Sequence, residues 1–278
     1  MERNRTLASI VKRPATSKKY DYGHLLILGG SKHYAGAPIL NALGAYIAGV
    51  DLVTIAAPAR VADIAVAHSP DIIAYPLPGD ILTKEHYAEI SSLIKRNVTA
   101  ILIGSGMGRD KSTLDLVAHL HKEHQDIPFV IDADALYSFN LIDPRPHDVL
   151  LPNQKEFALI SGNDTPAQST VKSAAFSFGC VILAKGHIDY ISDGKSVKEV
   201  KDATGKSVYL TKGGTGDLLA GVCASLIAQG INSFDAAYVS ASVLKRAGVL
   251  LGKERGPFYL PSELLPHISK SLLAELGK

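Results

Sequence analysis

Short apolar runs recur along most of the chain, and most of them are apolar at consecutive rather than alternate positions. A strand that is apolar on both faces is typical of a parallel sheet covered by helices on each side. We therefore predict seven buried strands, at residues 24–28, 52–56, 71–75, 100–103, 129–131, 149–151 and 181–184.

Segments with helical spacing of apolar residues lie between these runs, at 38–48, 60–67, 84–95, 112–124, 154–161 and 166–178. Strands that alternate with helices predict a series of right-handed βαβ units. The last third differs, because 188–192 and 197–200 flank an Asp193-Gly194 turn and predict an antiparallel hairpin. Helices at 216–229, 233–251 and about 261–276 follow.

The expected fold class is therefore α/β, with a mostly parallel central sheet between two helical layers. No linker, internal repeat or sharp change in composition divides the 278 residues, so we expect a single domain over residues 1–278. The basic segment 1–19 lacks the apolar stretch of a secretory signal, and we expect it to form an N-terminal tail or a cap.

Charge and cysteine content narrow the classes of function. The 29 Lys and Arg residues nearly balance the 27 Asp and Glu residues, which argues against a nucleic-acid-binding face. The longest uncharged apolar run, 218–231, is shorter than the roughly 20 residues that a membrane span needs. Cys180 and Cys223 are too few for a disulfide framework or a zinc site. We expect a cytoplasmic protein with no nucleic-acid or membrane partner.

The strongest chemical signal is the glycine-rich segment 212–217, which leads into an apolar helix. Glycines let several N–H groups converge, and a helix start adds unpaired N–H groups and the positive end of its dipole. Gly213, Gly214 and Gly216 would thus form a phosphate site, with Asp217 placed to accept a proton from an attacking hydroxyl. The alternative is a plain turn with a helix-capping aspartate.

Two further motifs follow predicted strands. Asn153 and Glu156, three residues apart at a helix start, could hold Mg²⁺ through water beside a phosphate. A capping box explains the same pair and, on this motif alone, explains it better. Lys185-Gly186 could place an ammonium group on a phosphate, and a hairpin turn is an equal alternative.

Weaker candidates remain. Asp132 could contact a ligand or metal, although strand termination with Asp134 as an N-cap explains it as well. His119, His121 and His124 suggest a metal cluster at first, but their spacing distributes them around a helix and favours a solvated face.

The ordered set of motifs resembles the ADP-dependent NAD(P)H-hydrate dehydratases of the ribokinase-like superfamily. The resemblance runs from about residue 20 to the C-terminus, and it rests on segments 23–31, 35–37, 103–108, 132–136, 152–157, 185–186 and 213–217. It implies a ribokinase-like fold and a repair reaction, in which hydrated NADH or NADPH is dehydrated while ADP is converted to AMP and phosphate.

The resemblance also implies roles for individual residues. Catalysis would involve Asp217 as base with Gly214 and Gly216. The hydrated dinucleotide would contact Ala37, Gly106, Asn153 and Asp217. The nucleotide would contact the segment of Lys185, Gly186, His187, Ile188 and Asp189, together with Gly213, Thr215 and Gly216. Glu156 would hold Mg²⁺ through water. A homotetramer is also expected.

The chain departs from the family at one informative place. Many members have His where Asn153 stands, which leaves the choice between ADP and ATP open. Many relatives also carry an N-terminal epimerase domain, which we expect to be absent here. Two other functions stay open: an ATP-dependent kinase of the same fold acting on a sugar, vitamin or thiazole, and a non-catalytic nucleotide-binding regulator.

Overall fold

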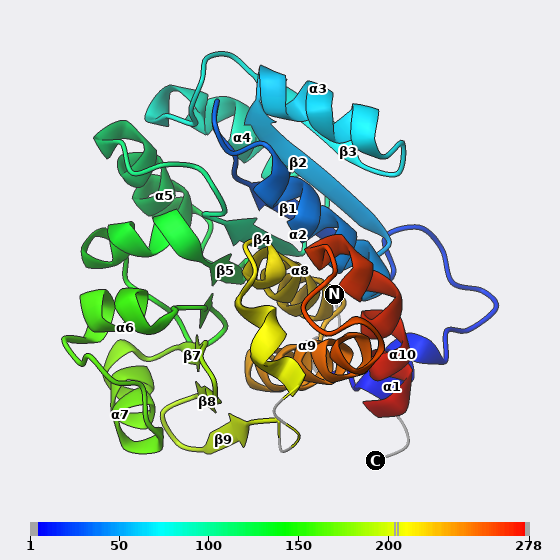
Figure 1. Cartoon of the computed structure of the whole chain (residues 1–278). Coiled ribbons are helices and arrows are strands. Elements are labelled where there is room, and N and C mark those ends of the chain that lie inside the picture. Colours follow the sequence, from blue (N-terminus) through cyan, green and yellow to red (C-terminus); the bar gives the residue numbers. More distant parts are fainter. Residues whose placement is uncertain (1–4, 203, 205, 276–278) are drawn as a thin grey trace.

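A nine-stranded sheet forms the centre of the molecule (Figure 1). The computed structural model describes residues 5–202, 204 and 206–275. The strands are β1 (His24–Leu28), β2 (Leu52–Pro58), β3 (Ile73–Leu77), β4 (Ala100–Ile103), β5 (Phe129–Ile131), β6 (Val149–Leu150), β7 (Val181–Ala184), β8 (Asp189–Ser192) and β9 (Val197–Val200).

The strand order in the sheet is β3-β2-β1-β4-β5-β6-β7-β8-β9. Strands β1 to β7 are parallel, whereas β8 pairs antiparallel with β7 and with β9. The expected parallel sheet with a terminal hairpin is therefore confirmed. Because the carboxyl ends of all seven parallel strands meet at one edge, the loops that follow them converge there.

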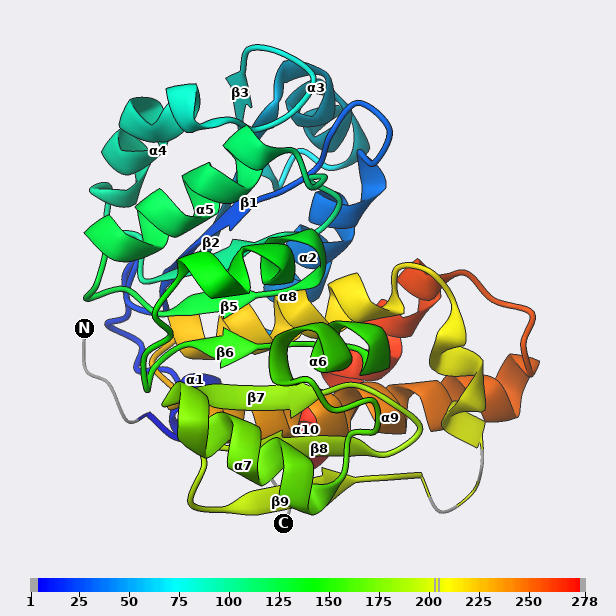
Figure 2. The same ribbon diagram turned by 90° about the vertical axis from the view of Figure 1, so that its left-hand side faces the viewer.

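Helices cover both faces of the sheet, which Figure 2 shows with α5, α6 and α7 in front and α8 and α9 behind. One layer contains α2 (Gly36–Ile47), α3 (Ala59–His68), α8 (Thr215–Ala228), α9 (Ser233–Arg255) and α10 (Leu265–Glu275); the other contains α4 (Tyr87–Ile94), α5 (Lys111–Glu123), α6 (Gln154–Ser161) and α7 (Gln168–Phe178).

Strand β1 shows why the sheet needs both layers. Leu25 and Ile27 belong to one buried cluster, and Leu26 and Leu28 belong to the other. Successive side chains of a strand point to opposite faces, so a strand that is apolar throughout must be covered on each side. The three-layer α/β/α arrangement follows directly from the consecutive apolar positions in the sequence.

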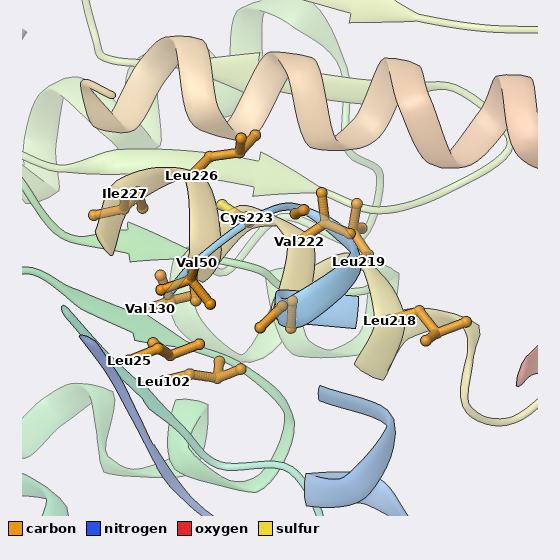
Figure 3. Packing of buried hydrophobic residues seen from close by; sticks show 14 of the residues in the cluster. Leu25, Val50, Leu102, Val130, Leu218, Leu219, Val222, Cys223, Leu226 and Ile227 are labelled. Atoms are coloured by element: carbon orange, nitrogen blue, oxygen red, sulfur yellow. The ribbon is translucent and has the colours of Figure 1, made fainter. Parts of the chain in front are cut away.

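Helix α8 is almost entirely buried and lies over the centre of the sheet. Figure 3 shows Val222, Cys223 and their neighbours on the same side of the sheet as Leu25, Leu102 and Val130. The helix crosses α2 at Gly221, where an added Cβ would lie 2.1 Å from the backbone oxygen of Asn41. Only glycine permits so close a crossing, and it fixes the first turn of α8 relative to α2.

Several elements differ from their expected positions. The third strand is β3, two residues later than predicted, and it includes Pro76. Proline lacks a backbone N–H but is tolerated here because β3 lies at the edge of the sheet. The helix expected at 84–95 is a short 3₁₀ turn, η1 (Lys84–His86), followed by α4.

The 3₁₀ helices η2 (Ala133–Leu141), η3 (Lys206–Thr211) and η4 (Pro261–Leu264) were not predicted as such. They have three residues per turn, so the helical spacing used to find α-helices does not detect them. None of the described helices combines the length with the uncharged apolar run that a membrane crossing needs.

The described part of the basic N-terminal segment packs against the body of the molecule. It contains a five-residue helix, α1 (Leu7–Val11), whose Ile10 is buried. Arg13 stacks on the ring of Tyr22 and forms an ion pair with Asp51 at 2.8 Å. Of the described residues, the part around Ile10 and Arg13 packs against the body, whereas residues 14–16 and 18–21 are exposed.

Candidate active site

The predicted site residues gather at the carboxyl edge of the sheet. Asp132 follows β5, Asn153 follows β6 and Lys185 follows β7, and these strands are neighbours. Helix α8 begins beside them, in the other layer of the molecule. Residues that are far apart in the sequence are thus brought together by strand order alone.

A buried ion pair lies at the centre of this edge. The Nζ atom of Lys185 lies 2.5 Å from Oδ1 of Asp132, and the side chain of Asp132 is only 3% exposed. Burial alone would lower the pKa of Lys185, but the carboxylates of Asp132, Glu156 and Asp217 raise it above its ordinary value. Lys185 is therefore a fixed cation surrounded by acidic groups.

Asp217, in the first turn of α8, has a strongly perturbed carboxylate. Burial, reinforced by the negative charge of Asp132, raises the pKa of Asp217 to about 7, although Ser105 and Lys185 act in the opposite direction. A carboxylate with a pKa near neutrality can accept a proton and release it again. This property fits the role of a general base, which the sequence predicted for Asp217.

The glycine-rich segment has the geometry of an anion site. Gly214 is the N-cap of α8 and has a positive φ of 102°, and no side chain caps the helix. The N–H of Thr215 donates to the backbone oxygen of Lys212 at 3.2 Å, and the first-turn N–H groups that follow it are left for a ligand. A Cβ added at Gly216 would meet a single neighbouring atom within 4 Å, Nζ of Lys185 at 3.9 Å. The helix start and the ammonium group thus face the same space.

A cavity of about 440 Å³ adjoins the helix start. Its lining includes the predicted residues Asn153, Lys185, Gly186, His187, Asp189, Thr215 and Gly216, and also Leu210, Thr211, Leu219, Leu244 and Lys245. The leucines provide an apolar wall and the glycines and lysines provide a polar end. This combination suits a ligand with an apolar ring and a phosphate group.

A second cavity of about 470 Å³ lies at the opposite edge of the sheet. Its lining includes Val98, Pro128, His147 and Ile231, which lie near the amino-terminal ends of the strands, and none of the predicted site residues. Although it is slightly larger, it lacks the helix start and the perturbed carboxylate. We therefore place the candidate active site at the carboxyl edge.

Two of the predicted nucleotide contacts have structural roles of their own. The Thr215 hydroxyl donates to the backbone oxygens of Leu210 and Lys212, which ties the glycine-rich segment to the residues before it. Asp189 accepts a hydrogen bond from the N–H of Gly186 and forms an ion pair with Lys245. Neither Ile188 nor Gly213 lines the cavity.

The residues expected to contact the hydrated dinucleotide lie on two sides of Asp217. Asn153 lines the 440 Å³ cavity. Gly106, in the loop after β4, approaches Ala37 and Tyr34, because an added Cβ would lie 3.4 Å and 2.8 Å from their Cβ atoms. Ser105, next to Gly106, lies near enough to the Asp217 carboxylate to lower its pKa, although the Ser105 hydroxyl forms no hydrogen bond with the described residues. Asp217 therefore lies between the cavity and this loop.

Asn153 and Glu156 form a capping box at the start of α6. The N–H of Glu156 donates to Oδ1 of Asn153 at 3.0 Å, and the N–H of Asn153 donates to Oε2 of Glu156 at 2.7 Å. Burial raises the pKa of Glu156 above its ordinary value. Among the described residues, no group of three or more His, Cys, Asp or Glu side chains is arranged to hold a metal ion.

Some weaker expectations were wrong. Asp134 does not cap a helix; its carboxylate accepts the N–H of Gly108 and pairs with Arg109 at 2.7 Å. His121 does not lie on a solvated face, because it is buried and its Nε2 lies 2.8 Å from Asp148. The spacing of three histidines around one helix could not show which of them faces inward.

Two site residues were missed or ranked low in the sequence. Asp132 looked like a strand-terminating residue, yet its charge acts on both Lys185 and Asp217. Lys245 was not selected at all. A signal existed, since Lys245 is a cation on the face of α9 that Ala241, Leu244 and Gly248 make apolar.

The fold is an α/β fold of the ribokinase type, and the site at its carboxyl edge is a candidate anion-binding site. A ribokinase-like superfamily protein from Enterococcus faecalis superposes with a TM-score of 0.83 at 20% identity, covering 98% of this chain and 96% of that chain. The family model described as NAD(P)H-hydrate dehydratase matches residues 25–270. The chain belongs to the NAD(P)H-hydrate dehydratase family.

Individual relatives agree with this assignment. The bifunctional NAD(P)H-hydrate repair enzyme of Pyrobaculum aerophilum is 39% identical over 93% of this chain and 52% of its own length. An ADP-dependent (S)-NAD(P)H-hydrate dehydratase of Nitrosopumilus maritimus is 31% identical over 94% of this chain and 92% of its own length. The chain thus spans about half the length of the first of the curated relatives that it matches.

Among solved structures, the ADP/ATP-dependent NAD(P)H-hydrate dehydratase of Bacillus subtilis, co-crystallised with ATP and Mg²⁺, superposes with a TM-score of 0.77 at 23% identity. The alignment covers 98% of this chain and 99% of that chain. The family match favours the dehydratase over the two alternatives, the small-molecule kinase and the regulator.

Proposed function

We propose that this protein dehydrates (6S)-hydrated NADH and NADPH to the active cofactors and converts ADP to AMP and phosphate. The observation that carries the proposal is the position of Asp217. Its perturbed carboxylate lies in the first turn of α8, between the cavity beside Lys185 and the loop that holds Ser105 and Gly106. Membership of the dehydratase family supplies the substrate class.

The chemistry follows from the leaving group. Hydroxide leaves a ring carbon poorly, whereas phosphate leaves well. The Asp217 carboxylate would accept the proton of the ring hydroxyl while that oxygen attacks the terminal phosphorus of ADP and the bond to AMP breaks. Loss of phosphate, with a proton from the neighbouring ring carbon, then restores the double bond of the nicotinamide ring.

The remaining residues would stabilise the transferred group. The N–H groups of Gly214 and Gly216 and the Lys185 ammonium group would neutralise charge on the phosphoryl oxygens. Ala37, Gly106 and Asn153 would hold the hydrated dinucleotide, and the segment from Lys185 to Asp189 would hold the adenine nucleotide with Gly213, Thr215 and Gly216.

We propose Mg²⁺ as the cofactor. Glu156 is a buried carboxylate near Lys185 and Asp132, and Asn153 lines the cavity; the capping box engages Oε2 of Glu156 and the single side-chain oxygen of Asn153. The other carboxylate oxygen of Glu156 fits a magnesium ion held through water. When bound, the ion would neutralise charge on the nucleotide phosphates.

The decisive experiment uses purified protein with hydrated NADH, Mg²⁺ and either ADP or ATP. Recovery of the reduced-nicotinamide absorbance, with one AMP and one phosphate formed per NADH, is expected with ADP. If no NADH returns while ATP phosphorylates a sugar, vitamin or thiazole, the kinase function replaces this one. Nucleotide binding without any turnover would instead support a regulator.

Three further properties belong to the proposal. We propose one domain over residues 1–278, a homotetramer, and a cytoplasmic location. Light scattering coupled to size exclusion tests the assembly, and a monomer at working concentration would contradict it. Location is tested by fractionation of the source cells.

A further inference from the structure

Lys245 is a buried cation that the proposed chemistry does not use. It lies on α9 at the wall of the 440 Å³ cavity, and its side chain is only 9% exposed. A lysine so far from water needs several oxygen partners to offset the loss of hydration. Three oxygen partners of the Lys245 ammonium group belong to one short segment of the chain.

That segment is residues 185–189, which connects β7 to β8. The Nζ atom of Lys245 donates to the backbone oxygens of Gly186 at 3.0 Å and His187 at 3.3 Å, and lies 3.1 Å from Oδ2 of Asp189. The other carboxylate oxygen of Asp189 accepts the Gly186 N–H at 2.9 Å. The segment is thus folded around the ammonium group of a helix far away in the sequence.

We propose that Lys245 is a positioning residue, which holds segment 185–189 in the shape that binds the phosphate-bearing nucleotide. The segment lines one side of the cavity, and the start of α8 lines another. Its first residue, Lys185, must reach both Asp132 and the space before Gly216. A shift of the segment would move Lys185 away from the anion site without touching Asp217.

The test compares Lys245→Met with a matched control, Arg246→Met. Arg246 is the next cation on the same helix but is exposed. Lys245→Met should weaken ADP binding about 10- to 100-fold, the effect of losing hydrogen bonds from a charged group. Arg246→Met should bind ADP as the wild type does. Calorimetry measures both without any need for turnover.

Kinetics separate positioning from a merely structural role. In Lys245→Met, KM for ADP should rise about 10- to 100-fold, and kcat should fall less than in Asp217→Asn, because the base keeps its place while the Lys185 ammonium group shifts. In Lys245→Ala, n-propylammonium should partly restore ADP affinity, whereas n-propanol, which fills the same space without the charge, should not. Rescue by both compounds alike would show that only volume matters and would overturn the proposal.

A double variant guards against simple misfolding. Lys245→Met with Asp189→Asn leaves no unpaired buried charge, so its stability should return towards that of the wild type. ADP affinity should stay low, because the two backbone oxygens still lack their donor. Full recovery of affinity would mean that Lys245 only neutralises Asp189, and the proposal would fail.

The inference rests on the proposed function for its choice of ADP as the ligand. Amide hydrogen exchange on nucleotide-free protein makes the two separable. Lys245→Met should speed exchange in peptides covering 185–189 and leave the rest of the sheet unchanged. If the wild type bound no ADP, the proposed function would fail while this measurement still decided the role of Lys245. Unchanged exchange there would refute it.

Discussion

The molecule contains two buried acidic centres at opposite edges of the sheet, and they differ in how far their carboxylates are satisfied. At the amino-terminal edge, Asp148 is fully buried and accepts hydrogen bonds from His121, from the N–H of Phe129, and from the N–H and Nε of Arg145. At the carboxyl edge, Asp217 is buried beside the negative charge of Asp132.

The pKa values show the consequence. Burial would raise the pKa of Asp148, but His121, Phe129 and Arg145 outweigh it and lower that pKa below its ordinary value. Burial and Asp132 raise the pKa of Asp217 to about 7. A carboxylate with four donors stabilises the fold, whereas one that is short of donors is free to exchange a proton with a ligand.

The largest effect should come from replacing the under-satisfied carboxylate. Asp217→Asn removes the proposed base and should lower kcat about 10³- to 10⁴-fold. ADP affinity should change by less than about threefold, since the N–H groups at the start of α8 remain. Steady-state kinetics and calorimetry measure the two quantities. Wild-type turnover in this variant would remove Asp217 from the mechanism.

The complementary change at the other edge should affect stability and not catalysis. Asp148→Asn leaves His121 and Arg145 without their carboxylate and should lower the free energy of unfolding by about 3–5 kcal/mol. Urea denaturation measures this loss, with Asp80→Asn as the control, because Asp80 pairs with Lys32 in an exposed ion pair. Under conditions where Asp148→Asn is folded, a large fall in its kcat would contradict the division of roles.

The two carboxylates should also give opposite dependences of stability on pH. The folded-state pKa of Asp217, about 7, exceeds the unfolded value of 3.8, so the folded protein loses stability as pH rises between them. Asp217→Asn should therefore be more stable than wild type by up to about 4 kcal/mol above pH 7. The lowered pKa of Asp148 stabilises the fold above pH 3.8 and loses this effect as pH falls.

Thermal unfolding from pH 4 to pH 8 measures this difference between the wild type and Asp217→Asn. The gap should be close to zero near pH 4 and should widen to its full size by pH 7. A gap that is constant across this range would mean that Asp217 does not titrate between these values, and the contrast with Asp148 would be lost.

The smallest effect tests the neighbour that perturbs Asp217. Because the base must be ionised, kcat/KM should rise with pH to a plateau above about 7. Asp132→Asn removes a negative charge beside Asp217 and frees the Lys185 ammonium group, so this rise should move to lower pH. The pH profile of kcat/KM measures the shift, and a shift to higher pH would show that Asp132 acts on Asp217 in another way.

Much of the fold followed from the sequence because apolar runs report burial. The consecutive apolar positions of β1 and β4 required a sheet covered on both faces, and such a sheet was found. The boundary of β3 was misplaced: the predicted strand, 71–75, stopped before the proline at position 76, whereas an edge strand has room for it.

The site was predictable where chemistry is local in sequence and hidden where it is not. The segment ending in Asp217 carries its glycines and its acid together, so both its phosphate site and its base could be proposed from the sequence. Asp132 pairs with a lysine that is 53 positions away in the sequence. Lys245 donates to backbone oxygens that are 58 and 59 positions away. Only the order of the strands and the packing of α9 bring these partners together.

The crossing of α2 and α8 at Gly221 bears on how the substrate would be positioned relative to Asp217. Helix α2 carries Ala37 at its beginning and α8 carries Asp217, and the Asn41 side chain donates to the backbone oxygen of Asp217 at 2.8 Å. The two helices therefore form one packed unit, which would set the distance between Ala37, proposed to contact the hydrated dinucleotide, and the proposed base Asp217. The absence of a side chain at Gly221, one turn along α8 from Asp217, allows this close packing and would therefore set the geometry of the proposed reaction.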